Sequence, residues 1–228
     1  PVKNYNIIMP AITNIKGIGP AKAKLFAQLD LNTVSDLLHY YPRTYQDRRP
    51  DAKLSAFKRA ESVAGIYTVI RTQSIPAKAL LIFKAFLRDD AGNLIEAVWF
   101  KKKIRRFDPF MQMRRDFKPD AKLWIIGKRD DKGSFFSNKI TVEEYYPVNS
   151  AEAKINAGRI TPVYSLTQGL TNKFFRAAQF YALSEYLQEE KEVLPPELTQ
   201  KRNLLNIRQA LCAVHFPKSA SELESARR

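Results

Sequence analysis

Residues 63–100 read VAGIYTVIRTQSIPAKALLIFKAFLRDDAGNLIEAVWF. Runs rich in β-branched and aromatic residues alternate here with polar breaks, which is typical of consecutive β-strands. The predicted strands are Val63–Thr72, Ala79–Arg88 and Asn93–Phe100. A polar loop, Gln73–Lys78, separates the first two, and a tight turn at Asp89–Gly92 separates the last two.

Two further strands, Ala121–Arg129 and Ser134–Val142, follow a basic segment, Lys101–Phe117, which should be partly helical and interrupted by Pro109. Three strands, a helical insert and two more strands is the chain order of the OB-fold, a five-stranded β-barrel. An SH3-like barrel has a similar number of strands but lacks the long insert. The sequence therefore predicts an α+β protein built around an OB-fold barrel.

Helical periodicity flanks the barrel on both sides. Before it, apolar residues recur at spacings of three and four within 12–41, with a second short helix expected over Thr33–Tyr40. After it, an amphipathic run over Asn172–Glu190 follows the cap Thr171, and a last short helix spans Leu204–Val214. We therefore divide the chain into a helical segment (1–62), the OB-fold (63–148) and a second helical segment (149–228).

The chain is strongly basic. Its 228 residues include 38 Lys and Arg against 23 Asp and Glu, a formal net charge of +15, and the pI is near 9.9. Eight cations face two acids within Lys101–Lys118, so the charge is a patch rather than a uniform coat. Such a patch is typical of nucleic-acid binders, although an ordinary basic protein is the simpler alternative.

Membrane and secreted classes are not favoured. No apolar run reaches the length of a membrane span, and we find no leader sequence. The single cysteine, Cys212, rules out an internal disulfide framework. We expect a cytoplasmic, monomeric protein.

Adjacent aromatics end the third predicted strand, and lysines follow them. Bases can stack on an exposed ring of Trp99 or Phe100 while cations hold the phosphates. The expected phosphate contacts are Lys101, Lys102, Lys103, Arg105 and Arg106. Since neighbours on a strand point to opposite faces, one of the two rings should be buried. An equal alternative is that both aromatics belong to the core and the lysines are only a solvated charged run. Loop contacts are expected at Lys78, Lys132 and Phe135.

The segment Ile15-Lys16-Gly17-Ile18-Gly19-Pro20 resembles the turn of a helix–hairpin–helix. Such a turn exposes backbone amides to which a phosphate can dock, but it serves equally often as a packing unit.

Enzyme motifs are absent from the sequence. We find no phosphate-binding loop, and the only histidines, His39 and His215, have no metal-ligand spacing with Cys212. We therefore expect no catalytic residue, no metal site and no cofactor in this chain.

Four stretches taken together resemble the RecG family of branch-migration helicases. They are Ile15–Pro20 with Thr33–Arg48, Ile160–Leu170, Pro195–Leu198, and Ala210–Pro217. They occur in the family's order and cover the chain from about Ile12 to Arg228. The resemblance is to the wedge domain, and it implies a fragment whose ATP- and Mg²⁺-binding motor domains are absent.

The resemblance implies a function as well. In RecG proteins the OB-fold wedge splits DNA strands at stalled forks and Holliday junctions during repair and recombination, and its aromatics stack on exposed bases. Trp99 and Phe100 fall on the family's paired aromatics. The implied partners are branched DNA and a single-strand-binding protein, in a bacterial, nucleoid-associated setting. The fragment itself should be inactive as an ATPase.

Two other functions stay open at this stage. The barrel groove is also suited to an acidic peptide, such as the tail of a single-strand-binding protein. A free-standing OB protein for plain single strands is the third hypothesis, which the helical flanks disfavour.

Overall fold

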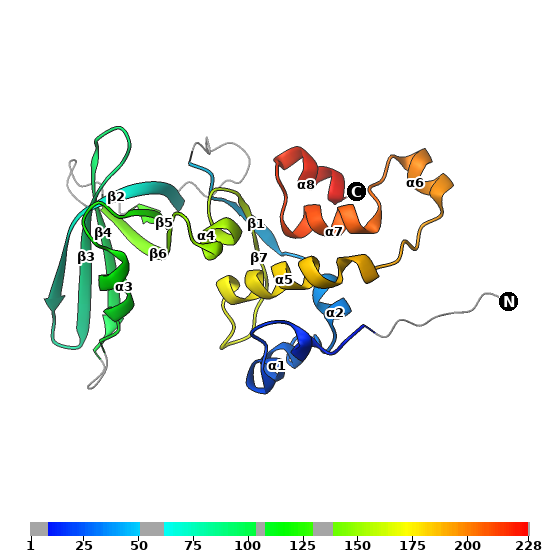
Figure 1. Ribbon diagram of the computed structural model, residues 1–228, viewed down its shortest axis with the longest axis horizontal. Helices are drawn as coiled ribbons and strands as arrows, with labels where there is room; N and C mark the ends of the chain where they lie inside the picture. The colour runs from blue at the N-terminus through cyan, green and yellow to red at the C-terminus, as the bar shows by residue number, and fades with distance from the viewer. Residues whose placement is uncertain (1–8, 51–61, 104–107, 130–138, 228) are drawn as a thin grey trace. The chain divides into compact units, whose positions relative to one another are not determined.

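The computed structural model describes residues 9–50, 62–103, 108–129 and 139–227. Its contacts divide the chain into two compact units. Asp47–Gly158 form one unit, called the barrel unit below; Pro1–Gln46 and Arg159–Arg228 together form the other, the helical unit. The two helical segments at the ends of the sequence therefore share one unit, and the barrel unit interrupts it in the sequence (Figure 1).

The barrel unit contains five strands that close into a barrel. They are β2 (Ser62–Pro76), β3 (Leu80–Arg88), β4 (Leu94–Lys102), β5 (Lys122–Arg129) and β6 (Lys139–Pro147). The strand order is β2-β3-β4-β6-β5, and only the β4–β6 pair is parallel. Helix α3 (Met111–Asp116) falls between β4 and β5, and α4 (Ala151–Asn156) follows β6. The predicted OB-fold and its insert are confirmed.

Three of the predicted boundaries were wrong. Gln73–Pro76 is not a loop, because backbone pairing with β3 extends β2 to Pro76 and leaves only residues 77–79 as the connection. Lys101 and Lys102 pair with β3 and belong to β4, so the helix begins only at Met111. The fifth strand runs to Pro147 because Val142–Pro147 pair with β5. The turn predicted at Asp130–Gly133 lies outside the described residues.

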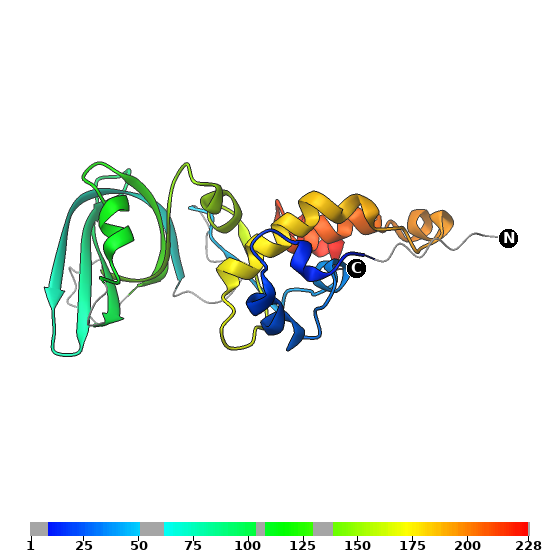
Figure 2. The same cartoon turned by 60° about the horizontal axis from the view of Figure 1, so that its bottom comes forward.

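The barrel is filled from every strand and from the insert. Phe83, Ala85 and Leu87 of β3 are fully buried, and Phe110, Met113 and Phe117 of the insert join the same core. Helix α3 accordingly lies against the barrel strands (Figure 2).

Gly127 marks a close backbone approach between β5 and β6. The β5–β6 register shifts between Ile126 and Gly127, and a Cβ at Gly127 would lie 2.3 Å from the carbonyl oxygen of Thr141. Only a residue without a side chain fits there.

We expect Gly127→Ala to destabilise the barrel unit by about 3 kcal/mol, because neither backbone can move without breaking ladder hydrogen bonds. Urea unfolding of parent and variant measures this. Equal free energies of unfolding would show that the β5–β6 contact can open without cost.

The helical unit is built from both ends of the chain. Its elements are η1 (Ile12–Asn14), α1 (Pro20–Ala27), α2 (Val34–Leu38), β1 (Thr44–Asp47), β7 (Ile160–Val163), α5 (Asn172–Tyr186), η2 (Leu187–Glu189), α6 (Pro196–Arg202), α7 (Ile207–His215) and α8 (Ala220–Ala226). Strands β1 and β7 pair as a small sheet. The sequence analysis predicted neither this sheet nor the helices α6 and α8. No helix in the described part of the chain is long and apolar enough to span a membrane.

One core joins these elements. Phe26, Val34 and Leu37 from the N-terminal side pack in the same cluster as Phe175 and Leu211 from the C-terminal side. The predicted caps are present: the Thr33 side chain accepts the N–H of Asp36, and that of Thr171 accepts the N–H of Phe174. Tertiary burial thus fixes helices that would be too short to persist alone.

A buried histidine lies in this core. His215 is fully buried, its Nε2 lies 2.7 Å from the carbonyl oxygen of Leu38, and its Nδ1 lies 2.9 Å from the hydroxyl of Tyr164. Because the carbonyl can only accept, Nε2 donates to it, and Nδ1 accepts the tyrosine proton. Burial lowers the pKa of His215 from 6.5 to about 4, so the ring is neutral near pH 7.

The stability of the helical unit should therefore fall in mild acid. Below pH 6.5 His215 becomes protonated in the unfolded chain, whereas in the folded chain it stays neutral down to about pH 4. The free energy of unfolding should therefore fall by about 3 kcal/mol over that window. Denaturant unfolding from pH 7.5 to 4 measures the slope. His215→Gln should be less stable at pH 7.5 but should lose less stability on acidification; an unchanged slope would assign it to other groups.

Candidate nucleic-acid interface

The two adjacent aromatics of β4 point to opposite faces of the sheet. Trp99 is 7% exposed and lies in the barrel core, its ring centroid 5.0 Å from that of Phe117. Phe100 is 50% exposed on the other face. Burial removes Trp99 from the surface at which a base could stack, which leaves Phe100 for that role.

Phe100 belongs to an apolar row that crosses three strands. Ile75 of β2 lies opposite Ile82 of β3, which lies opposite Phe100 of β4. Since Phe83 is in the core, its neighbour Ile82 and the partners of Ile82 face outward. We call this surface the outer sheet face; it comprises Arg71, Gln73, Ile75, Ile82, Lys84, Phe86, Glu96, Val98, Phe100 and Lys102.

Exposed lysines gather at the end of the barrel next to this row. Lys102 lies opposite Leu80, and the backbone N–H of Lys103 donates to the carbonyl of Ala79 at 3.1 Å. These contacts bring the lysines of β4 to the residue 77–79 connection, which carries the exposed Lys78. Three predicted contacts (Lys78, Lys102 and Lys103) thus lie at the same end of the barrel as Phe100, whereas Lys101 follows Phe100 in β4 and points to the opposite face.

The positive charge at this end is largely uncompensated. Among the residues that the structure describes, Lys78, Lys102 and Lys103 form no ion pair. Lys101 donates to the carbonyl of Pro109 at 3.1 Å and lies 5.6 Å from the ring centroid of Phe110. The predicted contacts Arg105, Arg106, Lys132 and Phe135 lie outside the described residues.

The hairpin-like turn of the helical unit is tied to its own core. Gly17 has a φ of +89°, as a tight turn requires. The Nζ of Lys22 donates to the carbonyl of Gly169 at 3.2 Å, and that of Lys16 lies 5.4 Å from the Tyr181 ring. These contacts favour the packing alternative for this turn.

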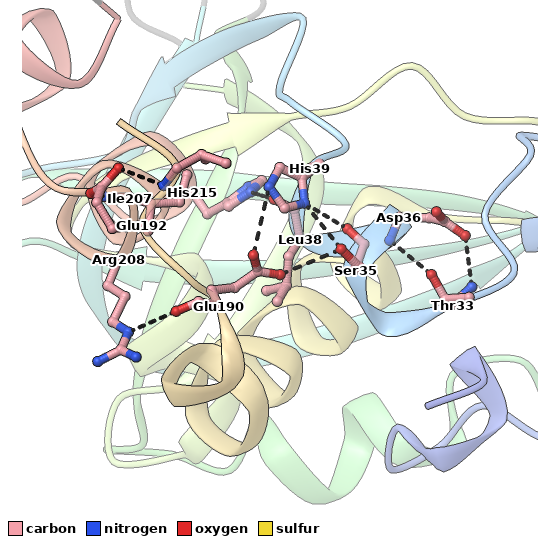
Figure 3. A network of polar contacts seen from close by, with 11 residues as sticks. Thr33, Ser35, Asp36, Leu38, His39, Glu190, Glu192, Ile207, Arg208 and His215 are labelled. Atoms are coloured by element: carbon pink, nitrogen blue, oxygen red, sulfur yellow. Dashed lines mark hydrogen bonds and ion pairs between the residues drawn. The ribbon is translucent and has the colours of Figure 1, made fainter. Parts of the chain in front are cut away.

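Figure 3 shows a second polar cluster, at α2 in the helical unit. Ser35 donates to Glu190 at 3.4 Å, and Nε2 of His39 lies 3.9 Å from the same carboxylate. This is no catalytic triad, because Nδ1 of His39 donates to the backbone carbonyl of Ser35 at 2.9 Å and cannot take the hydroxyl proton. The cluster joins α2 to the segment after η2.

Backbone N–H groups donate hydrogen bonds to two carboxylates next to this cluster. Burial alone would raise the pKa of Asp36, but the N–H groups of Thr33 and Asn32 donate to its carboxylate and lower it. Glu192 accepts the N–H groups of Leu194 and Ile207, which lower its pKa as well. Figure 3 shows the bond to Ile207. Among the described residues, no three His, Cys, Asp or Glu side chains form a group that could hold a metal ion.

The sequence analysis missed most of the outer sheet face. Ile75 was assigned to a loop, and Ile82, Arg71 and Phe86 were not singled out. Strand alternation places Ile82 beside Phe100 only when the register of the β3–β4 hairpin is known, and it places Ile75 beside Ile82 only when β2 is known to extend past Thr72.

Comparisons with known proteins agree with this architecture. A family model described as the RecG wedge domain matches residues 11–183. The ATP-dependent DNA helicase RecG of Thermotoga maritima is 28% identical over 216 residues, which cover 93% of this chain and 26% of that protein. The RecG of Bacillus subtilis is 30% identical over 219 residues, which cover 96% and 30%.

A solved structure of RecG bound to a three-way DNA junction is also similar. It matches with a TM-score of 0.78 and 27% identity, over 96% of this chain and 29% of its own. The chain therefore spans about 25–30% of the length of these relatives.

The opposite faces of Trp99 and Phe100 predict opposite effects on stability. Trp99→Ala should cost about 3–5 kcal/mol, because it leaves a cavity in the barrel core. Phe100→Ala should cost about 1 kcal/mol or less, because it removes only a surface cross-strand contact. Chemical unfolding tests both, and equal losses would contradict the assignment of the two faces.

Proposed function

The chain belongs to the RecG wedge domain family, and we propose that it binds branched DNA and separates the strands at the branch point. The observation that carries the proposal is the exposed Phe100 ring beside uncompensated lysines at one end of the barrel. At a branch point the last base pair has no neighbour on one side. An exposed aromatic ring can replace that neighbour by stacking.

The lysines supply the second part of the interaction. Lys78, Lys102 and Lys103 would neutralise phosphates of the arms that meet at the branch, which gives affinity without sequence preference. The ring would stack on a base, and the lysines would contact phosphates. A duplex end or a junction offers both an exposed base and phosphates, whereas intact duplex offers only phosphates.

The wider role follows from the relatives, whose name is ATP-dependent DNA helicase RecG. We propose that the domain acts at stalled replication forks and Holliday junctions, in DNA repair and recombination and near the bacterial nucleoid. This chain carries no ATP-binding motif, so ATP and Mg²⁺ would act in a part of the relatives that it does not span. It would bind DNA as a monomer and not hydrolyse ATP.

The outer sheet face supports one other occupant. A row of Ile75, Ile82 and Phe100 flanked by lysines also suits a peptide with apolar and acidic side chains, such as the tail of a single-strand-binding protein. Fork binding and peptide binding differ in their dependence on unpaired bases.

We expect the chain to bind a synthetic three-way fork more tightly than matched duplex or single strand, with an affinity that falls steeply as salt rises. Phe100→Ala should weaken fork binding by about 1–3 kcal/mol, the worth of one stacked base. Fluorescence anisotropy with labelled DNA measures both.

Leu94→Ala is the matched control, since Leu94 is exposed at the other end of β4. If Phe100→Ala and Leu94→Ala bind forks like the parent, the ring does not stack at the branch. If an acidic peptide binds more tightly than any DNA, the peptide alternative replaces this proposal.

A further inference from the structure

A bulge in β2 changes which residue faces β3. Val69 lies opposite Leu87 and Arg71 opposite Phe86, so Ile70 is the extra residue between them. In a regular ladder Ile70 would lie opposite Phe86. Bulges commonly re-aim side chains next to functional sites, and this one brings Arg71 opposite Phe86 while Ile70 stays 41% exposed.

The re-aimed arginine lies on an aromatic ring. The Cζ of Arg71 is 3.7 Å from the centroid of Phe86, and the Arg71 side chain is exposed. In the part of the chain that the structure describes, no carboxylate pairs with Arg71, whereas Lys84 on the same face pairs with Glu96 at 2.8 Å. Arg71 therefore offers an uncompensated, planar cation that is already held in place.

This chemistry suits unpaired nucleotides. A guanidinium plane can stack on a base while its N–H groups donate to a phosphate, and a ring beneath it fixes its orientation. A duplex hides its base faces and cannot use the stacking surface. A guanidinium held in this way would therefore favour single-stranded DNA over duplex.

The pair lies on the same face as Phe100, at a distance that strand geometry sets. Phe100 lies opposite Ile82, and Arg71 lies opposite Phe86, four residues further along β3. At about 3.3 Å per residue the offset along β3 is about 13 Å, and two strand spacings of about 4.8 Å between β2 and β4 bring the separation to about 16 Å. A stacked strand covers that distance in about five nucleotides.

We propose that Arg71, stacked on Phe86, is a second DNA site that holds an unpaired arm about five nucleotides beyond the branch point. The inference rests on the proposed function, because it extends the DNA path that begins at Phe100. It adds a residue that would contact the unpaired arm, and a direction for that arm along β3.

The test is a series of forks whose single-stranded arm grows from zero to eight nucleotides, with affinity measured by anisotropy. For the parent, affinity should rise until the arm has about five nucleotides and then level off. Arg71→Gln should weaken binding of the long-armed forks by about tenfold and leave binding of the armless fork unchanged. Arg71→Lys keeps the positive charge but lacks the planar guanidinium, and it should recover less than half of the gain in affinity.

Arg115→Gln is the charge-matched control, because Arg115 is exposed on α3, away from the outer sheet face. An equal loss in this control, full recovery with Arg71→Lys, or no gain with arm length in the parent would each overturn the inference. None of these results would affect the preference of the parent for an armless fork over duplex, or the weaker fork binding of Phe100→Ala. Those two measurements test the proposed function separately.

Discussion

Strand alternation within a closed barrel is the constraint on which the rest depends. Successive side chains of β4 must point to opposite faces, so one of two adjacent aromatics fills the barrel and the other faces solvent. Phe83, Phe117 and Tyr145 surround the ring of Trp99 and fix which one is buried. The exposed position of Phe100 is therefore a consequence of core packing and needs no separate structural device.

Much of the fold could be predicted from the sequence because it depends on local patterns. The barrel strands, the insert and the caps Thr33 and Thr171 were recognisable from β-branched runs and polar cap residues. The RecG resemblance is confirmed by the family model over residues 11–183. Strands β1 and β7 escaped prediction because each is four residues long, and its partner lies more than a hundred residues away.

The candidate site was less predictable, for a different physical reason. Which aromatic is exposed depends on strand phase, and which side chains join it depends on hairpin register. A single bulged residue, Ile70, changes the register, and no composition rule reveals it. The lysines were found because charge is visible in a sequence, whereas the apolar row and the arginine on Phe86 exist only once the strands are paired.

The division of the helical unit between the two ends of the chain also bears on how the protein folds during synthesis. Ile12, Val34 and Leu37 share a core with Phe175 and Leu211, which emerge from the ribosome only after the whole barrel unit. The barrel can form while the N-terminal helices still lack their partners. Such long-range contacts slow folding, so the apolar faces of α1 and α2 stay open to chaperones or to aggregation until α5 and α7 have been synthesised.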